Sequence, residues 1–389
     1  MKIYFIGQKG IPTVGGGVEN YVDNLAVRLA KTGHDVYVYT RWNYTNKNKR
    51  QYKGVKLINL PSLPLKNFDT ISHTILAVFH VLFRKADVIH FHSIGPSSLL
   101  WLPKILKFKT AIVATFQSQC YLHKKWNILA QAYLRFGEFI LCTFADAIIV
   151  PSKILQNRAK NIYGRESILI PNGVSFSYDK KSNLLKKLGL KKDDYFLAVS
   201  RLVKHKGLHY LIEAYNNLKT DKKLVIVGGS AYTDDYVREI KDLAIQNSNI
   251  IFAGARSGKI LQQLFHNAYA FIQPSESEGL SIALLEAMSH KLPIIASDIE
   301  ENCEVINGVG FLFKNKNIDD LKINMRYVQN YPKKAKNIGR LAYLKAKKNY
   351  DWDKLFNEVF RIYENYSKKE KRAKINIFKK NLHYNSFKN

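Results

Sequence analysis

Residues 270–297 read AFIQPSESEGLSIALLEAMSHKLPIIAS, and this stretch decides the fold. Ala270–Pro274 is a short apolar run that predicts a buried strand, and the polar loop after it leads into Ser281–Ser289, which predicts a helix. Pro293–Ser297 is apolar again and predicts the next strand. A strand, a helix and a second strand in this order are typical of a parallel sheet with helices packed on it.

The same alternation runs through the rest of the chain, and it falls into two sets. Short runs rich in Val, Ile or Phe alternate with helix-length segments, which predicts an α/β fold of two Rossmann-like, doubly wound parallel-sheet domains. The first strand set is Ile3–Gly7, Asp35–Thr40, Val55–Leu60, Asp87–His92, Thr110–Phe116, Ala147–Pro151 and Ser167–Pro171. The second set is Tyr195–Ser200, Leu224–Gly229, Ile250–Gly254, Ala270–Pro274, Pro293–Ser297 and Gly310–Phe313. The main helices expected are Asn20–Lys31, Asp69–Phe83, Asn127–Phe144, Gly207–Leu218, Tyr236–Gln246 and Leu280–Ser289.

The two strand sets divide the chain into domains. The polar, Lys-rich stretch Ser175–Asp194 is the expected linker, so we place the domains at residues 1–175 and 176–350. We expect the two domains to face each other across a central cleft. Ligands of open parallel sheets bind at the carboxyl ends of the strands, so we expect the ligand site at these ends, in the cleft. A last helix is expected at about 351–367, followed by a basic tail at 368–389 that is either a frayed helix end or disordered.

Composition indicates the class of protein. The chain has 389 residues, of which 46% are hydrophobic and 24% charged, as in a globular protein of two or three domains. Its 3 cysteines have no short pair spacing, which argues against a disulfide scaffold or a zinc module and indicates a reducing compartment. Met1 and Lys2 lead straight into a strand, and no run reaches the roughly 18 apolar residues of a spanning helix; the closest, Ile71–Phe83, is interrupted by polar residues. We expect a cytoplasmic protein that is soluble or lies on a membrane.

Charge is distributed unevenly along the chain. The formal net charge of +30 implies an anionic partner, which could be a nucleic acid, a lipid surface or a phosphorylated substrate. Residues 1–190 carry 27 Lys and Arg against 9 Asp and Glu, residues 191–330 carry 17 of each kind, and residues 331–389 carry 17 against 5. A genome that favours Lys codons is the plain alternative, but it would not spare the middle of the chain.

Two glutamates flank a predicted helix start. Glu278 lies in the loop at the carboxyl end of a strand, and Glu286 lies about two turns into the following helix, on a face that can look back to the same place. The free N–H groups around Gly279, Leu280 and Ser281 form an anion site that phosphate would fill. A ligand with sugar hydroxyls at both ends and phosphates between them would suit this arrangement. The spacing alone also fits a capped surface helix with two solvated glutamates.

A second strand-to-helix turn, residues 200–207, reads SRLVKHKG. Arg201 offers a fork of donors and Lys206 a point charge, which is what a diphosphate needs. Either residue alone could be a solvated loop residue. Together with Glu278 and Glu286 on the same sheet edge, they favour a binding site.

A glycine-rich loop follows the first strand, where residues 10–19 read GIPTVGGGVE. Consecutive glycines, Gly16 and Gly17 among them, let the backbone approach a ligand closely and leave N–H groups free. The loop has neither the G-x-G-x-x-G dinucleotide fingerprint nor the Gly-Lys-Ser/Thr of a P-loop. A tight turn is the plain alternative.

At this point the chain resembles glycosyltransferase family 4, whose members are retaining enzymes with the two-domain GT-B fold. The resemblance covers about residues 1–365, and the Glu278-to-Glu286 motif is specific. The other matching motifs are Gly16-Gly17-x-Glu19, Gly33-His34-Asp35-Val36, His90-x-His92, Pro171-Asn172-Gly173-Val174, and Arg201 with Lys206-Gly207. Four further motifs are similar to a bacterial rhamnosyltransferase-like subgroup that builds capsule, O-antigen or cell-wall polysaccharide on a lipid carrier: Gly10-Ile11-Pro12, His73-Thr74, Ile94-Gly95-Pro96 and Lys125-Trp126.

The resemblance implies roles for these residues. The first domain would bind the acceptor, and the second would bind the donor, a nucleotide-diphosphate sugar. Arg201 and Lys206 would neutralise the donor diphosphate, Glu286 would hold the ribose, and Glu278 would hold the hydroxyls of the transferred sugar. The Gly16-Gly17 loop would close the phosphate side. Such enzymes need no metal or other cofactor, because fixed positive charge and helix N–H groups stabilise the leaving diphosphate.

One stretch departs from the family pattern, at residues 114–120, ATFQSQC. Gln117 stands where the family has a histidine beside the reacting sugar, and Cys120 stands where the subgroup has an aspartate. An amide can donate or accept a hydrogen bond but carries no proton at neutral pH. Gln117 can serve if the family residue only positions the sugar, and the chain is slow or inactive if that residue does more. His92 is either its substitute or a structural histidine.

The basic ends of the chain suggest a surface partner. In the GT-B fold the last helix packs back on the first domain, which would bring the two basic ends together. An acceptor carried on a polyprenyl diphosphate sits at an anionic bilayer, where each Lys or Arg contributes roughly 1 kcal/mol. Leu99–Lys109 mixes bulky apolar and basic residues as an interfacial element would, although a core helix with solvated lysines has the same pattern. We expect a peripheral protein on the inner face of the cytoplasmic membrane.

Several functions compete on this evidence. The leading prediction is a transferase of a hexose or deoxyhexose, with rhamnose suggested by the subgroup, acting on a lipid-linked saccharide. The alternative, motivated by Gln117, is a non-catalytic GT-B partner that assists an active transferase. Nucleic-acid binding is motivated only by the net charge and lacks a recognition motif. The Asp351-Trp352-Asp353 spacing is explained better by helix capping than by a metal site.

Overall fold

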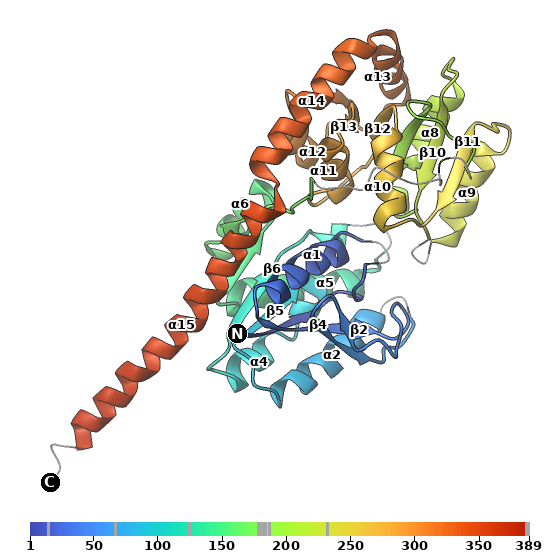
Figure 1. The fold of residues 1–389 in the computed structure, drawn as a ribbon. Helices are drawn as coiled ribbons and strands as arrows, with labels where there is room; N and C mark the ends of the chain where they lie inside the picture. Colours follow the sequence, from blue (N-terminus) through green and yellow to red (C-terminus); the bar gives the residue numbers. More distant parts are fainter. Residues whose placement is uncertain are drawn as a thin grey trace. The chain divides into compact units, whose positions relative to one another are not determined.

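The computed structural model describes the chain except for residues 14–15, 66–67, 123–125, 177–184, 186–187, 231–232 and 386–389, and it describes side chains as far as residue 368. The chain forms two compact units, each with its own sheet (Figure 1). The first unit comprises Met1–Pro12, Val18–Ile170 and Asp353–Asn389, and the second comprises Thr13–Gly17 and Pro171–Trp352. The predicted α/β fold with two parallel-sheet domains is confirmed.

The first unit is built on an eight-stranded sheet with the order β3-β4-β2-β1-β5-β6-β7-β8. Neighbouring strands are parallel except for the short β3, which pairs antiparallel with β4. The central strands β5 and β6 are buried at every residue, because helices cover both faces of a parallel sheet. The bounds are β1 (Lys2–Ile6), β2 (Asp35–Arg41), β3 (Gln51–Tyr52), β4 (Val55–Leu60), β5 (Val88–His92), β6 (Ala111–Thr115), β7 (Ala147–Val150) and β8 (Ile168–Leu169).

The helices of the first unit come from the first 170 residues and from the C-terminal end of the chain. The helices α2 (Phe68–Leu82), α3 (Ile94–Ser97), α4 (Trp101–Leu106), α5 (Ile128–Phe144) and α6 (Lys153–Tyr163) pack into one core cluster with the strands. The unit also contains α1 (Gly17–Lys31) from Val18 onward and α15 (Trp352–Asn385) from Asp353 onward. The Tyr363 hydroxyl of α15 lies 2.6 Å from Nδ1 of His90 on β5, and Arg28 of α1 forms an ion pair with Asp353 at 3.2 Å.

The second unit is built on a six-stranded parallel sheet with the order β11-β10-β9-β12-β13-β14. Alternate side chains of β9 enter two different core clusters, so the sheet is covered on both faces. One cluster includes α8 (Leu208–Asn216), α9 (Asp234–Ala244) and α13 (Ile318–Asn330); the other includes α10 (Gly258–Asn267), α11 (Ile282–Ser289), α12 (Glu300–Ile306) and α14 (Pro332–Asn349). The strands are β9 (Tyr195–Val199), β10 (Lys223–Val227), β11 (Ile250–Gly254), β12 (Ala270–Gln273), β13 (Ile294–Ser297) and β14 (Phe311–Phe313).

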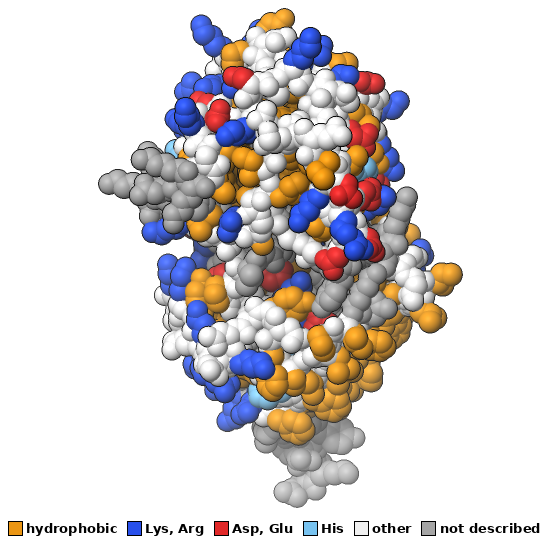
Figure 2. Space-filling view, turned by 90° about the vertical axis from the view of Figure 1, so that its right-hand side faces the viewer, with side chains coloured by type: hydrophobic (Ala, Val, Ile, Leu, Met, Phe, Trp, Pro, Cys, Tyr) orange, Lys and Arg blue, Asp and Glu red, His pale blue; other side chains and the backbone are white. Residues whose placement is uncertain are grey.

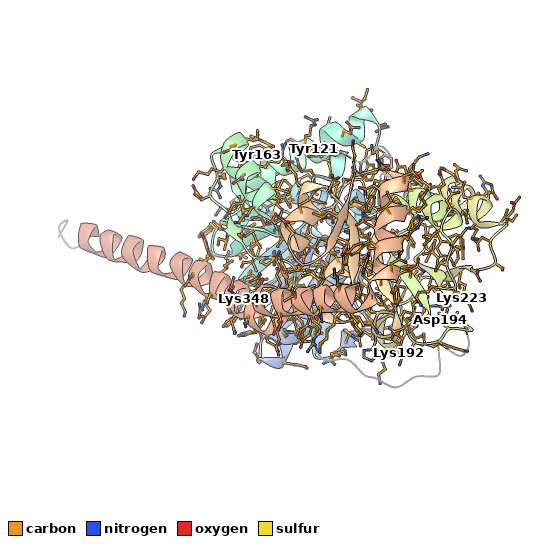
Figure 3. The ribbon with its side chains drawn as sticks, turned by 90° about the horizontal axis from the view of Figure 1, so that it is seen from above. Tyr121, Tyr163, Lys192, Asp194, Lys223 and Lys348 are labelled. Carbon is orange, nitrogen blue, oxygen red and sulfur yellow. The ribbon has the colours of Figure 1, made fainter. Side chains whose placement is uncertain are left out.

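The amino edge of the second sheet is closed by local contacts. The Lys223 amide at the start of β10 donates to the Asp194 carbonyl at 2.9 Å, and Figure 3 shows these two residues together. The Lys223 ammonium donates to the Gly189 carbonyl at 2.7 Å. These contacts are structural. Because ligands of open parallel sheets bind at the carboxyl ends of the strands, we expect the binding site at the opposite, carboxyl edge of this sheet.

The structure differs from the sequence expectations in local elements. The short strand β3 and the short helix α3 were not predicted, whereas α4 lies within Leu99–Lys109, for which a core helix was one of two alternatives. The backbone is helical through Asn385, so the tail expected to be frayed or disordered continues α15. Half of the expected linker, together with Val14, Gly15 and Lys125 of the quoted motifs, lies outside the described residues. Among the residues described, no helix combines the length and the hydropathy needed to cross a membrane.

Candidate functional site

Two loops of the second unit meet at the carboxyl edge of its sheet. One loop follows β9 and contains a short 3₁₀ turn, η2 (Lys204–Lys206), before α8 begins. The other follows β12 and leads into α11. Because β9 and β12 are paired in parallel, both loops leave the sheet at the same edge.

Gly207 allows the two loops to approach each other. Its φ is +66°, a left-handed conformation that glycine adopts without strain, and a Cβ placed there would lie 1.9 Å from the Pro274 carbonyl oxygen. Beside this contact, the Glu276 amide donates a hydrogen bond of 2.8 Å to the His205 carbonyl. The turn that contains Lys206 is therefore fixed directly against the loop that contains Glu278.

An ion pair joins the two predicted site residues at this contact. The Lys206 ammonium lies 2.6 Å from Oε1 of Glu278, which also accepts a 2.7 Å hydrogen bond from the Ser275 hydroxyl. The two charged side chains are only 15% and 8% exposed. Charge-assisted bonds in such a partly desolvated place hold their geometry firmly, so the cation is positioned before any ligand arrives.

Glu276 forms a second cluster in the same loop. It accepts a 3.0 Å hydrogen bond from the Tyr210 hydroxyl and lies 3.4 Å from the Lys316 ammonium. Burial and the bond to Glu276 raise the pKa of Tyr210 to about 12, so its hydroxyl stays a donor. Sequence reasoning missed these residues. Glu276 stands two residues before Glu278 in the quoted loop and offered a signal, whereas Tyr210 and Lys316 offered none.

Polar bonds fix the start of α11. The Ser281 hydroxyl accepts from the Leu284 amide at 3.3 Å, as an N-cap does, and donates to Oε1 of Gln273 at 2.6 Å. The Asn172 side chain donates to the Leu280 carbonyl at 2.9 Å. The helix N-terminus carries the partial positive charge of the helix dipole, and it stands next to the Lys206–Glu278 pair in the same loop.

The remaining predicted residues of the second unit lie around this core of contacts. Arg201 is exposed in the loop after β9, and Glu286 is half-buried two turns into α11. Gly279 is half-buried and Leu280 is buried between Glu278 and the helix. Gly16 has a φ of +115° and, like Gly17, is grouped with the second unit.

Gln117 belongs to the first unit, just after β6. It is 8% exposed, and its buried Nε2 has no hydrogen-bond partner among the described residues. Cys120 lies nearby in the chain, with its Sγ 3.1 Å from the Ser118 hydroxyl. Gln117 is thus a buried amide just after β6, at the carboxyl edge of the first sheet, and the part of the chain that the structure describes offers its Nε2 no acceptor.

His92 lies in the interior of the first unit. It is fully buried at the end of β5, with its ring stacked on Phe5 at 5.6 Å between ring centres. Burial lowers the pKa of His92 to about 3, so the imidazole is neutral near neutral pH. Of the two sequence interpretations, this environment favours the structural histidine over a proton carrier.

Known proteins that are similar to this chain over most of its length include glycosyltransferases. An uncharacterized glycosyltransferase of Methanocaldococcus jannaschii is 27% identical over 364 residues, which are 90% of this chain and 95% of the relative. The alpha-monoglucosyldiacylglycerol synthase of Streptococcus pneumoniae is 25% identical over 317 residues, covering 76% of this chain and 71% of that protein. The crystal structure of Anabaena HepE in complex with UDP-glucose has a TM-score of 0.78 at 20% identity, covering 94% of this chain and all of that one.

Family matches divide the chain in the same way as its two sheets do. Residues 15–178 match Glycosyltransferase Family 4, and residues 180–345 match Glycosyl transferases group 1. The first match spans most of the first sheet and the second spans the whole of the second sheet, with the Lys206–Glu278 pair inside it. On this evidence the chain belongs to the GT-B glycosyltransferases of family 4 and group 1.

Proposed function

We propose that this glycosyltransferase moves a hexose or deoxyhexose from a nucleotide-diphosphate sugar to a lipid-linked saccharide, with retention at the anomeric carbon. The proposed setting is the synthesis of capsule, O-antigen or exopolysaccharide at the inner face of the cytoplasmic membrane. Rhamnose is the sugar that the subgroup motifs favour. The observation that carries the proposal is the ion pair between Lys206 and Glu278 beside the start of α11.

The donor part of the proposal rests on the chemistry of that edge. A diphosphate would meet the Lys206 ammonium, the Arg201 guanidinium and the N-terminus of α11, three groups that favour anions. Glu278 would accept hydrogen bonds from the sugar hydroxyls, and Glu286 would accept them from the ribose. Backbone N–H groups at Gly16, Gly17, Gly279, Leu280 and Ser281 would add donors to the phosphates. The UDP-glucose complex of HepE supports a donor of this class.

The chemical step needs no metal in this proposal. As the bond between the anomeric carbon and the phosphate oxygen breaks, the pair of electrons goes to that oxygen, and Lys206 and Arg201 stabilise its developing charge. The departing oxygen takes the proton of the acceptor hydroxyl, which attacks from the same face. Gln117 would position the sugar through its amide and would not transfer a proton.

The acceptor part of the proposal rests on charge and on one relative. The first domain and the C-terminal residues contain the basic excess of the chain, which suits an acceptor on a polyprenyl diphosphate in an anionic bilayer. The pneumococcal relative is named as the synthase of a glycosylated diacylglycerol, which is a lipid product. We place the protein in the cytoplasm, peripheral to the membrane.

A binding screen tests the donor site. Calorimetric titration with UDP-glucose, dTDP-rhamnose and other nucleotide sugars identifies the donor, and its nucleoside diphosphate is then titrated alone. Lys206→Ala should weaken both ligands about tenfold or more, because a charge-assisted bond contributes about 1.5–3 kcal/mol. Glu278→Ala should weaken the nucleotide sugar more than the diphosphate, because it removes a contact to the sugar.

Lys204→Ala is the matched control. Lys204 lies in the same 3₁₀ turn, but its ammonium is paired with Glu239 at 3.5 Å and its side chain is 65% exposed. This variant should bind the donor like the wild type. Equal affinities for the Lys206, Glu278 and Lys204 variants would place the donor elsewhere.

A non-catalytic GT-B partner is the second candidate function, and Gln117 favours it. The residue stands where the family has histidine, and its buried amide has a donor without a partner among the described residues. A partner protein of this kind would bind the donor without transferring or hydrolysing the sugar. Release of nucleoside diphosphate from the selected donor, measured with the wild-type protein, separates this candidate from the enzyme.

A further inference from the structure

Helix α2 exposes an apolar surface that nothing in the chain covers among the described residues. Ile75, Leu76 and Phe79 are 38%, 40% and 54% exposed, and Phe83 just beyond the helix is 85% exposed. The opposite side of α2 is apolar as well and fills the core of the first unit with Ala77, Val78 and Val81. A helix on a water-exposed surface normally has one polar side, so an apolar outer side indicates a partner.

Helix α5 has the same character. Its inner residues Leu134, Ile140 and Leu141 belong to the core cluster that α2 also joins. Its outer side exposes Ile128 (84%), Leu129 (79%), Phe136 (49%) and Phe139 (47%). Positions 129 and 136 are two helical turns apart and 139 is one turn further, and at about 100° per residue all four exposed residues fall on one side of the helix.

Helix α4 lies in contact with both helices. The Lys107 ammonium, just after α4, donates to the Leu82 and Arg84 carbonyls at the end of α2, at 3.1 and 2.7 Å. The stretch Leu99–Lys109, expected to be interfacial, has both buried and exposed apolar side chains. Leu100 and Pro103 are buried in the first unit, whereas three other apolar side chains are exposed. We define the α2–α4–α5 face by its exposed apolar residues Ile75, Leu76, Phe79, Phe83, Ile105, Leu106, Phe108, Ile128, Leu129, Phe136 and Phe139.

Charge on this face has one sign. The acidic residues of the three helices, Asp69 and Glu138, are 4% and 0% exposed and are bonded to Arg41 and Arg158. Exposed basic residues accompany the apolar ones at Arg84, Lys85, Lys109 and Arg135. Figure 2 shows hydrophobic side chains gathered over a broad area of the first unit, with basic side chains to one side of that area. An apolar area with a basic border fits a partner that is apolar inside and anionic at its surface.

We propose that the α2–α4–α5 face is the surface by which this protein binds an anionic lipid bilayer. Its Phe, Ile and Leu side chains enter the region between headgroups and acyl chains, while Arg84, Lys85 and Lys109 contact the headgroup phosphates. A second copy of the chain fits less well, because a symmetric pairing of this face would bring like charges together. The purpose of the docking rests on the proposed lipid-linked acceptor, but lipid binding itself is measured separately.

The test uses the full chain and vesicles of two compositions, phosphatidylcholine alone and phosphatidylcholine with an equal amount of phosphatidylglycerol. The wild type should sediment with the anionic vesicles at about 0.15 M salt and more weakly with the neutral ones. The paired variants Phe79→Ser/Phe83→Ser and Ile128→Ser/Leu129→Ser, on two different helices, should each reduce the bound fraction about tenfold.

Leu341→Ser/Leu344→Ser is the matched control, because these residues of α14 in the second unit are 50% and 61% exposed. This variant should bind vesicles like the wild type. Thermal unfolding followed by circular dichroism checks that every variant is folded in both units. Affinity for the nucleoside diphosphate, measured without lipid, tests the donor site separately.

Two results would overturn the assignment of the face. One is sedimentation of both face variants that equals the wild type and the control. The other is a wild type that does not sediment with anionic vesicles and elutes as a dimer, while the face variants elute as monomers. That result would assign the face to contact with a second copy of the chain.

Discussion

Replacing Gly207 with alanine should separate the two loops of the donor site. The new Cβ would lie 1.9 Å from the Pro274 carbonyl oxygen, and atoms of this kind do not come closer than about 3 Å, so the backbones must part by about 1 Å. That movement breaks the bond between Glu276 and His205, which contributes about 1 kcal/mol, and weakens the Lys206–Glu278 pair, which contributes about 1.5–3 kcal/mol. The left-handed φ of +66° adds about 1 kcal/mol for alanine.

Gly258→Ala measures the conformational cost alone. Gly258 has a φ of +59° in the same unit, and nothing lies within 4 Å of a Cβ placed there. Its replacement should lower the free energy of unfolding by about 1 kcal/mol or less, because alanine also reduces the freedom of the unfolded chain. Gly207→Ala should cost about 4 kcal/mol, which lowers the melting temperature by about 10 °C.

Scanning calorimetry of both variants, with titration of the nucleoside diphosphate as a second measurement, checks this prediction. Gly207→Ala should lower the transition of the second unit and weaken diphosphate binding, whereas Gly258→Ala should leave binding unchanged. If the two variants melt together and bind alike, the close contact between the loops is not what positions Lys206.

Three further predictions concern other contacts. In a double-mutant cycle with Lys206→Met and Glu278→Gln, urea unfolding should give a coupling energy of about 1–3 kcal/mol, and a value near zero would mean that the ion pair does not hold the loops. Gln117→His should keep or raise the rate of sugar transfer measured by nucleoside diphosphate release, since the family has histidine there; a rate that falls more than about tenfold would make the amide itself essential. Burial keeps the pKa of His92 near 3, against 6.5 in the unfolded chain, so the unfolded state takes up the proton first and stability falls as the pH falls from 6.5 towards 3. His92→Gln should reduce the dependence of the free energy of unfolding on pH, between pH 6 and pH 4, by about 1.4 kcal/mol per pH unit. An unchanged pH dependence would contradict a buried neutral imidazole.

The strands of this protein could be predicted well because parallel strands are buried on both faces. Val55–Leu60 and Ile250–Gly254 have the predicted bounds, and the other predicted strands differ by one or two residues at one or both ends. The two-residue strand β3 could not be predicted, because its pairing with β4 depends on a tight turn at Lys53 and Gly54, both at positive φ. Helix α8 begins at Leu208 because Gly207 adopts a left-handed conformation.

The candidate site was predictable only in part. Glu278 and Lys206 could be placed at one sheet edge from the strand order, but their direct bond joins residues 72 positions apart in the sequence. The contacts of Glu276 with Tyr210 and Lys316 depend on how three loops fold over the same edge, which no local pattern encodes. The exposed sides of α2 and α5 were missed for a different reason: a segment that is apolar on every side reads in the sequence as an ordinary core helix.

The first unit is assembled from both ends of the chain, and this order matters during synthesis. Residues 171–352 of the second unit leave the ribosome before Val359 and Tyr363, which are fully buried in the first unit. Until α15 emerges, one side of the first sheet lacks its cover and His90 lacks the Tyr363 hydroxyl. The second unit can therefore finish folding first, although more than half of the first unit is translated before it. Until translation ends, the first unit remains incompletely folded and exposes apolar surface to which chaperones can bind.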